Sequence, residues 1–170
     1  MECIVPCNTF HSPEIFNACV KASGGIRPLH LVEITVEAIR RNHPQALKVG
    51  LMSTTGTRNF RLYHDLLEAE GLEVVEVDLD TQEELHRTIY DSERGIKAVG
   101  KTMWSVNRFA SYAQQIVDTG GADVLIMGCT EIPIVLESCG VPLVDPMVCG
   151  AQELVRRTYP DKLISEGNQD

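Results

Sequence analysis

VLIMGCTEIPIV, residues 124–135, sets the architecture predicted for the whole chain. Its first four residues form a short apolar run, which is typical of a strand buried on both faces. Pro133 then fits the first turn of a helix, where its missing N–H costs no hydrogen bond. Cys129 is therefore predicted to lie at the carboxyl end of a strand, in the turn that leads into a helix.

A thiol in that position has two interpretations. Ligands of open α/β sheets bind at the carboxyl ends of the strands, and the N–H groups at a helix start lower the pKa of a nearby thiol. The plainer interpretation is that a cysteine after an apolar strand is a small buried apolar residue. Cys129 alone does not decide between the two.

The same pattern occurs near the start of the sequence, in IVPCNT at residues 4–9. There too an apolar strand precedes a cysteine, Cys7, and a threonine follows closely. A helix comes next, which Ser12 can cap with Pro13 at its first position. Two cysteines at strand ends indicate a pair that faces each other across a cleft, which suits chemistry that needs one base and one acid.

Composition narrows the class of protein. The chain has 170 residues, enough for one large or two small domains. Its 24 acidic and 15 basic residues give a formal charge of −9, which disfavours a nucleic-acid groove or an anionic membrane surface as a partner. No apolar run reaches the length of a membrane span, and the first residues lack the form of a signal peptide.

The six cysteines contain no CxxC pair, so we expect reduced thiols in a cytoplasmic protein. Cys3, Cys7 and His11 are four residues apart and would share one face of a helix. Pro6 and the β-branched residues around it favour a strand instead, so no metal site is expected there.

The rest of the sequence alternates predicted strands and helices. Strands are expected at 4–5, 29–32, 47–53, 73–77, 124–127 and 141–144. Helices are expected at 14–22, from 32 to before Pro44, from 54 to before Gly71, from a capping box of Thr81 and Glu84 through 89, at 102–118, after Cys129 and at 152–157. Residues 94–101 are expected to form a basic loop, and the tail from 165 to be frayed. This alternation predicts a doubly wound parallel α/β sheet.

Two helices have predicted inward faces. In the helix at 14–22 the residues expected inside are Ile15, Phe16, Cys19 and Val20. In the helix at 102–118 they are Met103, Val106, Ala110, Ala113 and Val117, which repeat at three-four spacing.

Four motifs, in this order, resemble the aspartate/glutamate racemase family. They are PCNTFH at 6–11, PLHLVE at 28–33, VGL at 49–51 with TTGT at 54–57, and GCTEIP at 128–133. The resemblance spans residues 3 to about 158 and is nearer to aspartate racemases. Glutamate racemases usually carry His-Tyr-Pro where this chain has Glu131-Ile132-Pro133.

The resemblance implies a fold of two similar lobes, each Rossmann-like or flavodoxin-like with a parallel sheet, and an active site between them. It implies an amino-acid substrate and no cofactor, neither pyridoxal phosphate nor a metal. Residues 46–142 correspond to a complete second lobe. Residues 1–45 with 143–170 correspond to a remnant of the first lobe.

The chemistry of racemisation assigns a role to each of the two thiols. Racemisation removes the α-proton on one face of the substrate and returns a proton on the other, so a thiolate base and a thiol acid must flank the α-carbon. Cysteine, with an ordinary pKa of about 8.5, can serve in either role. We assign these roles to Cys7 and Cys129, exchanged according to the enantiomer consumed.

Substrate contacts are expected beside the thiols. Asn8, Thr9, Thr130 and Glu131 match the family's substrate contacts. Thr54, Thr55, Gly56 and Thr57 open a helix and could seat an anion on their N–H groups. The alternative is that these threonines only cap helices, and the two roles are compatible.

A side-chain carboxylate on the substrate would need a cation. The resemblance points to the loop around 93–97, with Arg94 as the better positional match and Lys97 next; the alternative is that both are solvated loop charges. His11 matches the family's motif histidine but could simply pack on the following helix.

The resemblance also implies a glycine-rich strand and turn before Cys3, where this sequence has only two residues. We therefore expect a truncated first lobe, impaired turnover and self-association through its uncovered strand edge, as a homodimer. The alternative function is a racemase-fold paralogue or fragment that acts only as a binding or structural module. Maleate isomerases and arylmalonate decarboxylases fit Glu131-Ile132-Pro133 less well.

Overall fold

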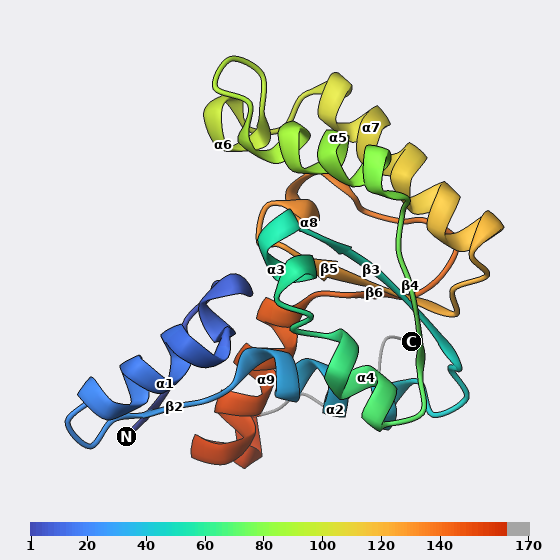
Figure 1. The fold of residues 1–170 in the computed structure, drawn as a ribbon. Coiled ribbons are helices and arrows are strands. Elements are labelled where there is room, and N and C mark those ends of the chain that lie inside the picture. Colours follow the sequence, from blue (N-terminus) through green and yellow to red (C-terminus); the bar gives the residue numbers. More distant parts are fainter. Residues whose placement is uncertain (163–170) are drawn as a thin grey trace.

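The computed structural model describes residues 1–162, and a four-stranded parallel sheet lies at its centre. The strands are β3 (Lys48–Ser53), β4 (Glu73–Val75), β5 (Val124–Gly128) and β6 (Leu143–Val144), in the spatial order β4-β3-β5-β6. Helices cover both faces of this sheet (Figure 1). The expected doubly wound α/β fold is confirmed.

Two apolar cores fill the space between the sheet and the helices. On one face lie α5 (Leu79–Tyr90), α6 (Ile96–Val99), α7 (Met103–Gln114) with its π-helical extension Gln115–Thr119, and α8 (Ile132–Val135). On the other face lie α2 (Leu31–Asn42), α4 (His64–Ala69) and α9 (Pro146–Thr158). Because helices cover both faces, the central strands are largely apolar, and every residue of β5 and every residue of β3 after Lys48 is buried.

The strand order creates a switch point between β3 and β5. From β3 the chain crosses to β4 on one side, and then returns to β5 on the other side of β3. The two strands pair in parallel with Ser53 opposite Gly128. The turns after Ser53 and after Gly128 therefore start side by side, at the position where open α/β sheets bind ligands.

A smaller unit lies beside this body. It consists of β1 (Glu2–Cys3), the short 3₁₀ helix Thr9–His11, α1 (Pro13–Ala22) and β2 (Arg27–Pro28), and β1 pairs with β2 in parallel. Helix α9 joins the unit to the body. A Cβ added at Gly150 of α9 would lie 3.0 Å from the Ile4 side chain, and Arg157 forms an ion pair with Glu2 at 3.5 Å. We call β1, β2 and α1 with their connections the N-terminal unit.

Several predicted boundaries move. The first strand is at 2–3 rather than 4–5, and the second is at 27–28, because α2 already begins at Leu31. The helix expected from 54 is split into α3 (Thr55–Asn59) and α4, since Arg61 has a φ of 51° and interrupts the helix. The loop expected at 94–101 contains the short helix α6.

The cap of α5 also differs from the prediction. Asp78, not Thr81, is the N-cap residue, and it accepts a hydrogen bond from the Thr81 N–H at 2.8 Å. The helix consequently begins three residues before the predicted capping box. An aspartate is as good an N-cap as a threonine, which is why the motif at Thr81 was misleading.

Both predicted inward faces are confirmed only in part: Phe16 of α1 packs on His11 and His30, and Ala113 and Val106 of α7 face the core. Every residue of α1 is at least partly exposed; Ile15 and Val20 are 46% and 44% exposed. In α7 the buried residues are Ser105, Phe109, Tyr112 and Ala113, whereas Met103 is 72% exposed. The predicted α7 face is rotated because the aromatic residues, which bury more area, determine the side that packs on the sheet.

The expected lobe boundary at 142 falls just before β6, which pairs with β5 in the large sheet. The α2 helix, expected in the first lobe, packs on the large sheet through Val32, Val36 and Ile39. The tail expected to be frayed, from 165, lies outside the described residues. Within residues 1–162, no helix is both long and apolar enough to cross a membrane.

Candidate active site

Cys129 follows β5 directly, as predicted, and it is buried. Its Sγ donates a hydrogen bond to Glu131 Oε2 at 2.8 Å, and the same oxygen accepts one from Thr130 Oγ1 at 2.9 Å. The other carboxylate oxygen of Glu131 is paired with Lys97 Nζ at 2.5 Å. Glu131 thus links the thiol after β5 to the ammonium on α6.

The electrostatics of this group differ from the expectation that the helix start lowers the pKa of the thiol. Burial, and then the hydrogen bond to the Glu131 carboxylate, raise the pKa of Cys129 to about 12. Burial also acts to raise the pKa of Glu131, but hydrogen bonds from Cys129, Lys97 and Thr130 lower it overall. The resting Cys129 is therefore a thiol beside an ionised carboxylate.

The turn after β3 starts next to Cys129, and two of its N–H groups already have partners. Thr54 caps α3 and accepts the Thr57 N–H at 3.4 Å, while the Thr55 N–H donates to His86 Nδ1 at 3.3 Å. A Cβ added at Gly56 would lie 3.4 Å from the Thr9 methyl group. The turn at 54–57, which is predicted to seat an anion, also packs against the turn that carries Cys7.

Hydroxyl contacts attach the Cys7 turn to that surface. Thr9 Oγ1 lies 2.9 Å from Thr57 Oγ1 and 3.5 Å from Thr54 Oγ1. The buried Asn8 accepts a hydrogen bond from the Tyr63 hydroxyl at 2.5 Å. The Asn8 Nδ2 is buried and has no partner among residues 1–162, so this turn contains a donor with an unused N–H. Cys7 itself is exposed.

His11 fixes the same turn from behind. It is buried, its Nε2 lies 3.1 Å from the Val5 carbonyl oxygen, and its ring packs against Phe16 and His30. Burial lowers the pKa of His11 to about 4, so the imidazole is neutral and donates Nε2–H to the carbonyl. His11 therefore holds the Val5 end of the turn that carries Cys7.

Of the two predicted cations, Lys97 joins the site and Arg94 does not. Arg94 is paired with Asp91 at 3.7 Å, and its guanidinium lies 4.7 Å from the centre of the Trp104 ring. That orientation directs it toward α7. Lys97, by contrast, lies 5.2 Å from the centre of the Tyr90 ring in addition to its pair with Glu131.

Tyr90 and His86 are site residues that the sequence did not reveal. The pKa of Tyr90 is raised by burial first, and then by Cys129; Glu131 and Cys7 also raise it, while Lys97 lowers it. One phenol is thus within electrostatic range of both thiols. Tyr90 stacks on His86 with ring centres 4.7 Å apart. Spacing along α5 could have found them, since Gln82, His86 and Tyr90 are four residues apart and Gln82 donates to the Ser53 carbonyl at 2.9 Å.

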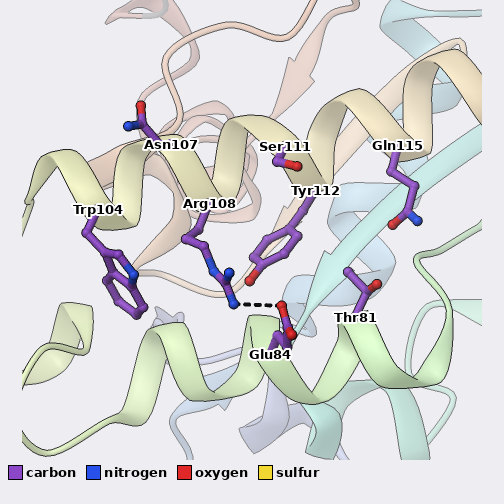
Figure 2. A pocket seen from close by; sticks show the side chains of 8 residues that line it. All are labelled: Thr81, Glu84, Trp104, Asn107, Arg108, Ser111, Tyr112 and Gln115. Carbon is purple, nitrogen blue, oxygen red and sulfur yellow. Dashed lines mark hydrogen bonds and ion pairs between the residues drawn. The ribbon is translucent and has the colours of Figure 1, made fainter.

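A groove of about 470 Å³ lies elsewhere, between α5 and α7 (Figure 2). Arg108 crosses it to Glu84 at 2.6 Å, and Trp104 lines one end. None of the predicted site residues lines this groove. Among residues 1–162, no group of three or more His, Cys, Asp or Glu side chains is arranged to hold a metal ion.

Known proteins resemble this chain over most of its length. Residues 3–154 match the family model described as Asp/Glu/Hydantoin racemase. The broad specificity amino-acid racemase RacX of Bacillus subtilis (strain 168) is 26% identical over 153 residues, which are 89% of this chain and 62% of that protein. An uncharacterized protein in the pnlA 3' region of Pectobacterium carotovorum subsp. carotovorum is 26% identical over 76% of this chain and 81% of its own length.

The fold is also shared with solved structures. An aspartate racemase homologue from Pyrococcus horikoshii OT3 has a TM-score of 0.71 at 24% identity, covering 92% of this chain and 66% of that one. This chain therefore spans slightly less than two thirds of the Bacillus and Pyrococcus proteins, and about four fifths of the Pectobacterium protein.

Proposed function

The chain belongs to the Asp/Glu/hydantoin racemase family, and on that basis we propose that it is a cofactor-independent amino-acid racemase acting through Cys7 and Cys129. The observation that carries the proposal is the meeting of two cysteine turns at one rim. The Cys7 turn packs on the Thr54–Thr57 turn through Thr9, and that turn starts beside Cys129 in the β3–β5 register. The shared influence of both thiols on Tyr90 supports the same pairing.

The proposed reaction consists of two proton transfers at the substrate α-carbon. One cysteine thiolate takes the α-proton, so that the C–H bond breaks and an S–H bond forms. The other thiol gives its proton to the opposite face, so that its S–H bond breaks and the new C–H bond forms. Product release and exchange with water return the two sulfurs to their starting protonation states.

Cys129 has a pKa raised to about 12, so it rests as a thiol and is suited to act as the acid when Cys7 is the base. In the opposite direction Cys129 must lose its proton, and the hydrogen bond from its thiol to the ionised Glu131 opposes that loss. Cys7, exposed on its turn, exchanges protons with water directly.

The carbanion formed in this reaction needs donors aimed at its carboxylate. Thr9 and Thr130 were predicted for this role, but their hydroxyls are engaged by Thr57 and Glu131. The buried Asn8 Nδ2 remains available and is the better candidate. In a low-dielectric site one such donor contributes a factor on the order of 10²–10³ in rate.

Aspartate is the substrate that we propose first, because Lys97 provides a cation beside Cys129 for a second carboxylate. Its partner Glu131 competes for the same ammonium, so a broader range of amino acids should be tested alongside. The proposal includes a reducing, cytoplasmic setting, which suits six free thiols. It also includes a homodimer, because the N-terminal unit exposes apolar side chains on α1.

The direct test is exchange in deuterated water without added cofactor. L-aspartate, L-glutamate and L-alanine should gain deuterium at the α-carbon, and the D-enantiomer should appear on chiral chromatography. Cys7→Ser and Cys129→Ser should each lower the rate by a factor on the order of 10²–10⁴, because a hydroxyl is a much weaker acid than a thiol. Cys19→Ser, on the exposed helix α1, is the matched control and should keep the wild-type rate. Wild-type turnover in Cys7→Ser would refute the two-thiol mechanism.

A further inference from the structure

The ring of Tyr90 is held by neighbouring side chains, whereas its hydroxyl has no hydrogen-bond partner among the described residues. The ring stacks on His86, with centres 4.7 Å apart and planes at 25°, and the Lys97 ammonium lies 5.2 Å from the ring centre. His86 is fixed in turn by the Thr55 N–H, which donates to its Nδ1. The Tyr90 hydroxyl, in contrast, has no hydrogen-bond partner among residues 1–162, and the residue is 49% exposed.

Contacts place Tyr90 next to the Cys129 end of the proposed site. The Lys97 ammonium lies 5.2 Å from the Tyr90 ring centre and pairs with Glu131, which accepts the hydrogen bond from the Cys129 thiol. The charges of Cys129, Lys97, Glu131 and Cys7 also affect the pKa of Tyr90. These groups come from three different parts of the fold, and Tyr90 is the last residue of α5, where the chain turns away. Tyr90 therefore lies beside Lys97 and the Glu131–Cys129 pair, with a hydroxyl that can donate to a substrate carboxylate.

We propose that the Tyr90 hydroxyl binds the α-carboxylate of the amino-acid substrate, and that His86 positions the Tyr90 ring for this contact. This inference rests on the proposed racemase function and adds a substrate-contacting residue to it. The contact is to the part that all amino acids share, so it applies equally to acidic and neutral substrates. Lys97 is then left to distinguish side chains.

The contact has a physical basis in the protonation state of the phenol. Burial and the nearby thiols and carboxylate raise the pKa of Tyr90, which keeps the hydroxyl protonated and able to donate at neutral pH. The carboxylate gains negative charge as the α-proton leaves, so the hydrogen bond strengthens during the reaction. No proton moves to or from Tyr90 in this step.

Calorimetric titration of the full chain with L-aspartate and with L-alanine tests the contact. Tyr90→Phe removes only the hydroxyl and should weaken both affinities by about tenfold, the size of one hydrogen bond to a charged group. Tyr159→Phe, at an exposed tyrosine near the end of α9, is the matched control and should bind as the wild type does. Equal affinities in Tyr90→Phe and wild type would overturn the proposal, and a loss confined to aspartate would overturn the assignment to the α-carboxylate.

Two substitutions test whether the His86 ring positions Tyr90. His86→Ala removes the stacked ring and should lower the affinity for both amino acids, whereas His86→Phe keeps a ring beneath Tyr90 and should restore most of it. Failure of His86→Phe to improve on His86→Ala would refute the positioning role. Binding that depends on Tyr90 but leads to no racemisation would support the contact and refute the proposed function. Racemisation with unchanged affinity in Tyr90→Phe would support the proposed function and refute the contact.

Discussion

The two cysteines belong to regions that are stabilised in different ways. Cys129 follows β5, whose residues are all buried between two apolar cores, and its thiol is bonded to Glu131. Cys7 belongs to the N-terminal unit, where the sheet has two strands of two residues each and α1 has no buried residue. The first region is stabilised by burial of apolar surface. The second is held in place mainly by specific contacts with the first.

The contrast shows that one half of a site can belong to an apolar core while the other half is attached to that core by a few contacts. The attachment consists of the Thr9–Thr57 contact, the Tyr63–Asn8 hydrogen bond and the packing against α9. Each of these is individually modest, on the order of 1 kcal/mol for a hydrogen bond. The geometry between the thiols is therefore more sensitive to changes at this junction than the stability of the fold is.

The largest difference between the regions should appear in thiol reactivity. Cys129 is buried with its pKa raised from 9.0 to about 12, which lowers its thiolate fraction by about a thousandfold. Iodoacetamide at pH 7.5, followed by peptide mass mapping, should modify the exposed Cys7 long before Cys129. Glu131→Gln removes the carboxylate that stabilises the protonated thiol, and should speed modification of Cys129 without affecting Cys7. Equal rates at the two cysteines in the wild type would contradict the contrast.

Substitutions in the two regions should differ by several kcal/mol in their effect on the free energy of unfolding. Leu125→Ala in β5 removes a fully buried side chain and should lower the free energy of unfolding by about 2–5 kcal/mol. Ile15→Ala in α1, at a residue that is 46% exposed, should cost about 1 kcal/mol or less. Urea unfolding followed by circular dichroism measures both. A larger cost for Ile15→Ala than for Leu125→Ala would mean that α1 is covered in solution, for example by a second copy of the chain.

Acid should weaken the N-terminal unit through His11. Its pKa is about 4 when folded and about 6.5 when unfolded, so the unfolded state binds the extra proton between these values. The stabilisation is present above pH 6.5 and is lost as the pH falls toward 4, by about 2–3 kcal/mol in all. His11→Phe should show that much less stability loss than the wild type when urea unfolding is compared at pH 7 and pH 4.5. Parallel losses in the two proteins would exclude His11 as the titrating group.

A small effect on stability is expected at the junction itself. Thr57→Val keeps the shape of the side chain but removes the hydroxyl bonded to Thr9, at a cost of about 1 kcal/mol. The racemisation rate should fall by about tenfold or more, because an ångström of displacement of Cys7 is expensive in catalysis. Thr57→Ser keeps the hydroxyl and should retain most of the rate. If the rate of Thr57→Val falls only as far as its smaller folded fraction accounts for, the two regions are not coupled through Thr57.

The sequence predicted the core region well because its signals are local. The apolar runs of β3 and β5, Cys129 after β5 and Pro133 in the first turn of α8 are all as expected, since each depends on neighbouring residues. The proposed site residues Cys7, Asn8 and Thr9 were predicted from the motif that they form. These features need no knowledge of which elements pack together.

The errors occur where distant packing decides. The orientation of Arg94 is set by Trp104 and Asp91, and the contribution of Tyr90 depends on where α5 ends relative to both thiols. The raised pKa of Cys129 follows from its burial, which outweighs the helix start that the local pattern emphasised. The inward face predicted for α1 is only partly covered, at Phe16, because amphipathic spacing shows which side can pack but not how much of it is covered.

The pairing of β1 with α9 also determines the order in which the protein can assemble during its synthesis. Glu2 and Arg157, which form an ion pair between these elements, are 155 residues apart in sequence. Contacts of such wide separation are slow to form, and a ribosome releases the N-terminal strand long before α9 exists. The contacts of Thr9 and Asn8 with Thr57 and Tyr63 can therefore form early, whereas the attachment of the N-terminal unit to α9 is completed only when nearly the whole chain has been synthesised.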